Sequence, residues 1–126
     1  ALGDHRKAIE YYERALAIDE AVFGPEHPNV AIRVNNLGSA WNALGDHRKA
    51  IEYLERALAI DEAVFGPEHP NVARELNNLG SAYFALEQKE KAKEYFEKAY
   101  KIWNAFFGEE HPQTKTVKQW LAACTP

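Results

Sequence analysis

ALGDHRKAIEYLERALAIDEAVFGPEHPNVARELNNLGSAYF, residues 43–84, is a unit that the chain contains nearly three times. Residues 1–42 match it at all but six positions, and residues 85–126 align with it without a gap. A period of 42 residues predicts units that stack in a row, because each unit buries its apolar side against its neighbours. The six differences are Tyr12/Leu54, Ile32/Arg74, Arg33/Glu75, Val34/Leu76, Trp41/Tyr83 and Asn42/Phe84.

Each unit holds one long and one short helical pattern. In residues 43–84, the long pattern runs from Asp46, a favoured N-cap residue, to Phe65, and Gly66 ends it. The short pattern runs from Pro70, a favoured first-turn residue, to Ala85. We expect the apolar residues that recur at helical spacing to be buried. These are Ala50, Tyr53, Leu54, Ala57, Leu58, Val64 and Phe65 in the long helix and Ala73, Leu76, Leu79, Gly80 and Tyr83 in the short helix.

The alternation of long and short patterns predicts an all-α solenoid of six helices in antiparallel pairs. The three units, 1–42, 43–84 and 85–126, then form a single domain. In the last unit the short helix becomes more polar and its apolar stripe shifts, as expected of a C-terminal cap. The polar residues are Lys115, Thr116, Lys118 and Gln119, and the apolar residues are Val117 and Trp120.

The first long helix has no preceding neighbour. We therefore expect an exposed apolar face on Tyr11, Ala15, Ile18 and Val22, and weak end-to-end self-association through this helix. The chain starts at Ala1 and not at a methionine, so we expect a piece of a longer protein, with further repeats before Ala1 if the protein is natural. The near identity of the first two units fits either recent duplication or consensus design.

Composition argues against several kinds of partner. Fifteen basic and nineteen acidic residues give a formal charge of −4 and a pI near 5.7, so no basic field is available to bind nucleic acid. No apolar run approaches membrane-spanning length, so we expect no membrane partner. The single cysteine, Cys124, excludes an internal disulfide, and with no signal-peptide pattern it indicates a reducing, cytoplasmic compartment.

The histidines invite a search for a metal site. His27, His69 and His111 recur in identical turns, and equivalent positions in stacked helix pairs lie more than ~10 Å apart. Zinc needs nitrogen ligands at about 2.0–2.1 Å, so these residues cannot share an ion. His5 and His47 also occur once per unit. We therefore expect no metal and no other cofactor, and we predict that the turn histidines cap the short helices ahead of the prolines that follow them.

Catalytic patterns are also missing from the sequence. No Ser-His-Asp or Cys-His arrangement emerges, and repeated glutamates such as Glu52 and Glu55 fit the solvated side of the long helices. Glu52 and Arg56 have the spacing of a favourable helical ion pair. Cys124 aligns with Ala40 in a small core position, so we expect a packed thiol there. The sequence therefore predicts a protein that is not an enzyme.

Several strings resemble the tetratricopeptide repeat, namely LGSAY at 79–83, Gly45-Asp46 in the aligned turn, and Ala50 with Ala57 seven residues later. The extra length over the family's usual repeat of about 34 residues lies in the long helix and the GPEHP turn. Together with the two Asn-Asn-Leu strings, these features resemble the long-repeat branch exemplified by kinesin light chains. The resemblance implies a right-handed superhelix in which the short helices are A helices and the long ones B helices, in B-A-B-A-B-A order.

In that family the A helices line the concave side of the superhelix, where extended peptides lie across them. Carried over by alignment, the concave face would show Ile32, Asn35, Ser39, Asn42, Arg74, Asn77, Ser81, Phe84, Thr116 and Gln119. An asparagine suits such a face because its amide both donates to and accepts from an extended backbone. Alternatively, Asn35 and Asn77 stiffen the stack, the role we favour for Asn36 and Asn78. The lysine and asparagine clamp of family members that bind chaperone carboxyl termini is not present.

The sequence therefore predicts a non-catalytic protein–protein interaction scaffold whose A-helix face binds an extended peptide of another protein. The alternative is a structural spacer or self-associating repeat rod without a dedicated ligand. The differences between the first two units fall mainly in the A helix, which favours a tailored peptide-binding face.

Overall fold

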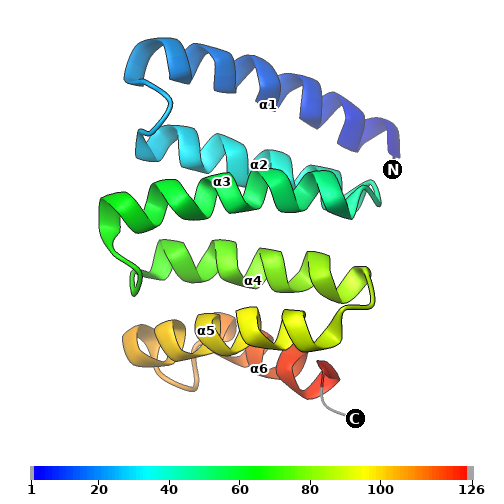
Figure 1. The fold of residues 1–126 in the computed structure, drawn as a ribbon, viewed down its shortest axis with the longest axis vertical. Coiled ribbons are helices and arrows are strands. Elements are labelled where there is room, and N and C mark those ends of the chain that lie inside the picture. The colour runs from blue at the N-terminus through cyan, green and yellow to red at the C-terminus, as the bar shows by residue number, and fades with distance from the viewer. Residues whose placement is uncertain (1, 125–126) are drawn as a thin grey trace.

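The computed structural model describes residues 2–124 and folds them into six α-helices, with no strand in that range (Figure 1). The helices are α1 (Leu2–Phe23), α2 (Pro28–Ala43), α3 (His47–Phe65), α4 (Pro70–Ala85), α5 (Lys89–Phe107) and α6 (Pro112–Cys124). Figure 1 shows them stacked in a row, each antiparallel to the next, with α1 and α6 at opposite ends. This confirms the predicted all-α solenoid of alternating long and short helices.

Histidine side chains start the short helices, as predicted. The backbone N–H of Asn71 donates to Nδ1 of His69 at 3.0 Å, and the same bond recurs at His27 and, from Gln113, at His111. Each histidine ring also stacks on the phenylalanine four residues earlier, with centroids 4.2 to 4.4 Å apart. The stacking fixes the ring so that Nδ1 faces a helix N–H that would otherwise have no partner.

The long helix α3 also has the predicted bounds. The backbone N–H of Lys49 donates to Oδ1 of Asp46 at 3.2 Å, which satisfies one of the free amides of the first turn. At the other end, Gly66 has a φ of 89°, a conformation that favours glycine. Arg56 does not pair with Glu52 within the helix as its spacing suggested. Instead its Nη2 donates to Glu20 of α1 at 2.8 Å, because the stack brings that carboxylate alongside.

Two glycines allow each short helix to approach the long helix that follows it. A Cβ on Gly38 would lie 2.6 Å from Cγ of Leu54, and one on Gly80 would lie 2.7 Å from the ring of Phe96. Both distances are too short for a side chain at the glycine positions. The backbone of α2 at Gly38 therefore packs against Leu54 of α3, and the backbone of α4 at Gly80 packs against Phe96 of α5. The missing side chains at Gly38 and Gly80 therefore set how closely these helices pack.

The core is a strip that follows the stack. The predicted stripe of α4 is buried throughout, and Ala50, Leu54 and Ala57 of α3 are fully buried. Burial was wrongly predicted for Val64 and Phe65, which are exposed. With 19 residues, α3 is longer than the 16-residue helices on either side of it, so its last turn lies beyond their cover.

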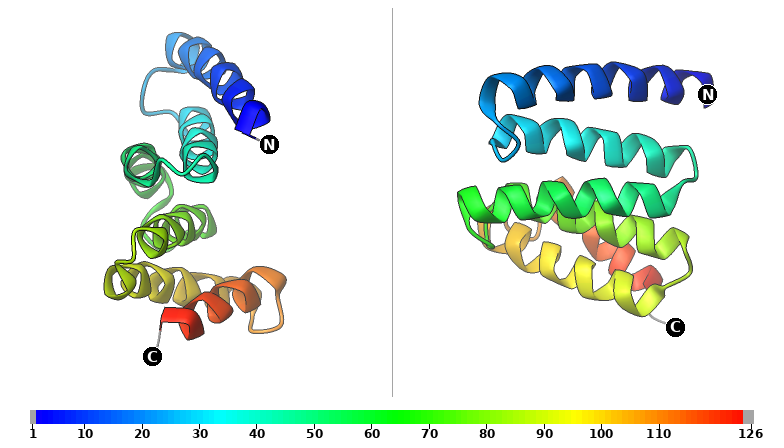
Figure 2. Two further views of the ribbon diagram at one scale, coloured as in Figure 1. Left: turned by 90° about the vertical axis from the view of Figure 1, so that its right-hand side faces the viewer. Right: turned by 45° about the horizontal axis from the view of Figure 1, so that its top comes forward.

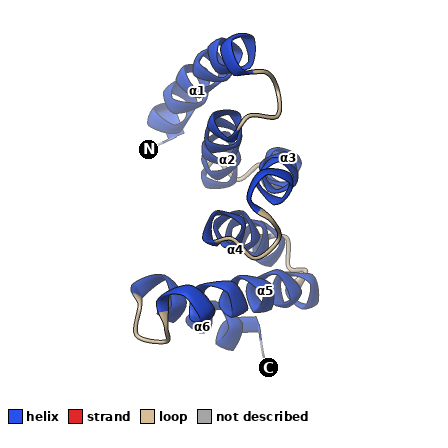
Figure 3. Ribbon diagram, turned by 90° about the vertical axis from the view of Figure 1, so that its left-hand side faces the viewer, coloured by secondary structure: helices blue, strands red, loops and turns tan. Residues whose placement is uncertain are grey.

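The helices form two rows when the stack is viewed from the side. Helices α2 and α4 lie on one side of the solenoid, and α3 and α5 lie on the other (Figures 2 and 3). At the amino-terminal end, α1 packs mainly against α2. The predicted apolar face on α1 is present, since Tyr11, Ile18 and Val22 are exposed, while Ala15 is half-buried.

Candidate peptide-binding face

The residues expected on the A-helix face are not equally accessible on α2. Ile32 and Ser39 are exposed, whereas Asn35 is only 5% exposed. The amide Nδ2 of Asn78 in α4 donates to Oδ1 of Asn35 at 3.0 Å. Asn35 and Asn78 therefore form a direct hydrogen bond between α2 and α4, so Asn35 serves the stack and does not present its oxygen to a ligand. Asn42 is half-buried, and its side-chain oxygen pairs with Nδ1 of His47.

On α4 all four expected residues are half-buried. Nε of Arg74 donates to Glu75 at 3.2 Å, and its Nη2 lies 3.8 Å from Oδ2 of Asp61, so part of its charge is compensated within the fold by that carboxylate. Oδ1 of Asn77 is buried without a hydrogen-bond partner in the described part of the chain. Ser81 lies one helical turn farther along, and Phe84 packs edge-on against Trp120 with ring centroids 5.3 Å apart.

On α6 both expected residues are exposed. The hydroxyl of Thr116 donates to the backbone carbonyl of Pro112 at 2.9 Å, which leaves the methyl group and both hydroxyl lone pairs available. Gln119 stands about one helical turn farther along. Four residues of the predicted face are exposed, namely Ile32, Ser39, Thr116 and Gln119. They offer aliphatic, hydroxyl and amide groups, a set that suits a peptide backbone better than a charged ligand.

A buried pair of acids next to this face was not predicted from the sequence. Asp61 of α3 is 1% exposed, and Glu75 of α4 is fully buried. Desolvation by burial, followed by the hydrogen bond to Asp61 and its charge, raises the pKa of Glu75 from 4.5 to about 9, although Arg74 opposes this shift. Glu75 is therefore protonated at neutral pH, and its hydroxyl can donate to the neighbouring carboxylate.

The signal for this pair was in the alignment of the repeats. Asp19 and Asp61 are equivalent, but the residue that faces them is Arg33 in the first hairpin and Glu75 in the second. Nε of Arg33 donates to Asp19 at 2.8 Å. The change from arginine to glutamate opposite an unchanged aspartate is the sequence signal for this pair, because the periodicity of apolar residues carries no information about buried charges.

The remaining reactive groups do not form a recognisable site. Within residues 2–124, no three His, Cys, Asp or Glu side chains are arranged to hold a metal ion. Cys124 is buried, and desolvation raises the pKa of its thiol. No helix in the described range combines the length and the apolar character needed to cross a bilayer.

The family model described as tetratricopeptide repeat matches the chain over residues 1–63, 32–105 and 76–124. The chain belongs to the tetratricopeptide repeat family. The fit of the stacked hairpins to three overlapping segments agrees with a family in which successive repeats share one continuous solenoid.

Solved structures with similar folds contain repeats of the kinesin light chain type. The chain is similar to a putative kinesin light chain from Podosopora anserina with nearly identical TPR-like repeats, with 30% sequence identity, a TM-score of 0.87, and coverage of 97% of this chain and 58% of that one. A variant of that protein gives the same identity and TM-score, with 57% of its chain covered. BtubC (BKLC) from P. vanneervenii follows with 28% identity, a TM-score of 0.79, and coverage of 98% of this chain and 54% of that one.

These comparisons support an interaction scaffold built of kinesin light chain-like repeats. The chain spans somewhat more than half the length of the solved chains it matches. No curated protein matches it significantly. Proteins of this repeat family generally mediate protein–protein contacts and are generally not catalytic, so the family points to a protein partner.

Proposed function

We propose that this tetratricopeptide repeat protein is a non-catalytic, cytoplasmic scaffold that holds an extended peptide of another protein across its A helices. The observation that carries the proposal is the Asn35–Asn78 hydrogen bond of 3.0 Å. It ties α2 directly to α4, so the accessible side chains of the two helices keep a fixed spacing. A pre-organised face of this kind loses little entropy when a peptide binds.

The chemistry of the face indicates the kind of peptide. Ile32 offers an aliphatic contact, and Ser39 and Ser81 offer hydroxyl groups that donate and accept. Nη2 of Arg74 already lies 3.8 Å from Oδ2 of Asp61, which weakens it as an anion site. The ligand of this proposal is therefore an extended segment of low charge, bound largely through its backbone.

A steric block on the face tests the proposal. We would screen a peptide library against the wild type and against Ser39→Trp, in which an indole occupies the exposed centre of the α2 face. The matched control is Glu52→Trp, because Glu52 is also exposed but lies on α3. The proposal expects selected peptides to lose at least about tenfold in affinity, roughly 1.4 kcal/mol, in the first variant alone. Peptides that bind both variants like the wild type would contradict it.

The exposed α1 face favours a second function, a self-associating repeat rod. Tyr11, Ile18 and Val22 present apolar side chains to solvent at one end of the solenoid. If the rod is the function, sedimentation should show the average mass rising with concentration, and Ile18→Lys should return the protein to a monomer. Exposed Arg14→Glu on the same helix is the control for a change of charge alone. A monomer at millimolar concentration would exclude the rod.

A further inference from the structure

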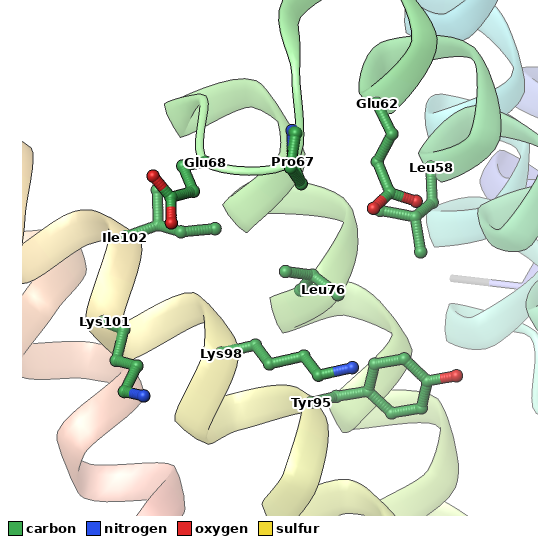
Figure 4. A pocket seen from close by; sticks show the side chains of 9 residues that line it. All are labelled: Leu58, Glu62, Pro67, Glu68, Leu76, Tyr95, Lys98, Lys101 and Ile102. Atoms are coloured by element: carbon green, nitrogen blue, oxygen red, sulfur yellow. The ribbon is translucent and has the colours of Figure 1, made fainter.

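A groove of about 420 Å³ lies on the side of the solenoid away from the A-helix face, between α3 and α5 (Figure 4). Its floor is Leu76 of α4, and the turn between α3 and α4 closes one end. The residues that line it are Leu58, Glu62, Pro67, Glu68, Leu76, Tyr95, Lys98, Lys101 and Ile102. A volume of this size is within the range of natural ligand pockets.

The groove combines an apolar floor with walls of opposite charge. Leu76 and Ile102 are buried beneath it, so a side chain that reached them would leave water almost completely. Glu62 belongs to the α3 wall, and Lys98 belongs to the α5 wall. Figure 4 shows the carboxylate of Glu62 beside Leu58, and the side chain of Lys98 extended below Leu76 with its amine beside the ring of Tyr95.

The same groove occurs one repeat earlier in a different state. It is lined by Pro25, Glu26, Arg56, Ala59, Ile60, Ala63 and Val64. There Arg56, the equivalent of Lys98, donates to Glu20, the equivalent of Glu62, at 2.8 Å. This ion pair links the two walls and uses both charges. Guanidinium matches carboxylate geometry better than a lysine ammonium does.

In the groove between α3 and α5 the two charges stay separate. No ion pair joins Glu62 to Lys98 in the described range, and both side chains are exposed. Glu68, in the turn between α3 and α4, adds a second carboxylate to the groove and lies beside Ile102 in Figure 4. Lys101, which replaces Ala59 of the earlier groove, adds a second ammonium on α5. The position therefore keeps an unused acid wall and an unused basic wall on either side of an apolar floor.

We propose that this groove is a docking site for a segment of a partner protein that carries one large apolar side chain between a basic and an acidic residue. The apolar side chain contacts Leu58, Leu76 and Ile102. The basic residue faces Glu62, and the acidic residue faces Lys98. This site is separate from the A-helix face, so the protein can bind two segments at once, one on each side of the solenoid.

A short peptide probes the site directly. The probe is acetyl-Lys-Gly-Leu-Gly-Glu-amide, titrated into the ¹⁵N-labelled chain while amide chemical shifts are recorded. Shift changes should concentrate at residues 58–68, 76 and 95–102, and a peptide with Gly in place of Leu should bind at least about fivefold more weakly, roughly 1 kcal/mol. Shifts confined to residues 32–42, 74 and 77–84 would overturn this proposal and leave the A-helix face as the site. No shifts at all would also overturn it.

Charge reversal separates docking from general attraction. Lys98→Glu should weaken the probe at least about fivefold and should bind acetyl-Lys-Gly-Leu-Gly-Lys-amide better than the wild type does. Lys93→Glu makes the same change of charge at an exposed position of α5 outside the groove, and it should leave both affinities unchanged. Circular dichroism would verify that both variants fold. Equal effects of the two variants would overturn the proposal.

Discussion

The first and second hairpins, α1–α2 and α3–α4, have nearly the same sequence, yet they carry different side-chain pairs at one interior position of the repeat. In the first hairpin Asp19 accepts a hydrogen bond from Arg33 at 2.8 Å. In the second, Asp61 faces Glu75, whose pKa is raised to about 9. The Arg33–Asp19 ion pair of the first hairpin is thus replaced in the second by two acids that share a proton, with Nη2 of Arg74 lying 3.8 Å from Oδ2 of Asp61. The third hairpin has Trp103 and Val117 at these positions, both buried, and no charge.

This difference shows that backbone geometry tolerates an ionic, a proton-sharing and an apolar pair at the same point. What changes is the dependence of stability on pH, since a buried acid must be protonated before the hairpin can close over it. The hairpins also differ in how far neighbouring helices bury the same side chain. Ile18 is 63% exposed and Ile60 is 6% exposed, although they are the same residue in the same position of the repeat.

The largest expected effect tests the proton shared by Asp61 and Glu75. Folding raises the pKa of Glu75 from 4.5 to about 9, so between these values the folded chain binds more protons than the unfolded chain. Stability from this group is therefore complete below pH 4.5 and is lost as the pH rises towards 9, with a slope of up to ~1.4 kcal/mol per pH unit.

Glu75→Gln keeps a hydrogen-bond donor for Asp61 but cannot ionise. It should stabilise the protein by up to about 5 kcal/mol at about pH 8, and the gain should disappear as the pH approaches 4.5. The measurement is urea denaturation at a series of pH values. Arg33→Gln in the first hairpin is the matched control, and it should destabilise the protein because it removes the partner of Asp19. A gain from Glu75→Gln that is equal at all pH values would show that Glu75 is not protonated in the fold.

The second effect tests the difference in burial between Ile60 and Ile18. Ile60→Ala removes a buried side chain and should lower the free energy of unfolding by about 3 kcal/mol. Ile18→Ala, its counterpart in the first repeat, should change it by less than about 0.5 kcal/mol. Urea denaturation of both variants measures the two values. Similar losses would mean that the face of α1 is covered in solution, and a dilution series would then show whether another copy covers it.

A smaller effect concerns a feature that the hairpins share. His69→Ala removes both the cap of α4 and the stack on Phe65, and it should cost about 1 kcal/mol of stability. His27→Ala should cost the same at the start of α2, because the two turns have the same geometry. His69→Asn restores a capping acceptor and should recover most of the loss. Thermal denaturation would measure all three, and unequal costs at the two turns would show that the surroundings of the cap matter more than the cap.

The smallest effect compares two turns between successive units. Glu87 has a φ of 64°, where the aligned residue of the preceding turn, Gly45, has a φ of 95°. A side chain is disfavoured in that conformation, so Glu87→Gly should stabilise the protein by about 0.5 kcal/mol. Gly45→Glu should produce a loss of similar or larger size. Thermal denaturation measures both, and a loss in Glu87→Gly would mean that the glutamate side chain contributes contacts that offset its strain.

The predictable part of this protein followed from local rules. The N-cap at Asp46, the ends of α4 at Pro70 and Ala85, and the histidine caps depend on groups within a few residues of one another, so sequence spacing alone identifies them. The role of Asn35 could not be predicted from the sequence. The choice between ligand contact and hydrogen bonding to Asn78 depends on the distance between two helices from different units.

The repeat by itself determined the period, the order of long and short helices, the turns and the glycines that let neighbouring helices approach. Only the stacked structure decided which copy of a repeated side chain is buried and that Glu75 holds a proton. It also decided that an ion pair between Arg56 and Glu20 bridges one groove between long helices, while the charges of the next groove stay unpaired. The reason is that helix formation depends on nearby residues, whereas burial and charge pairing depend on neighbours from other units, which two nearly identical sequences do not share.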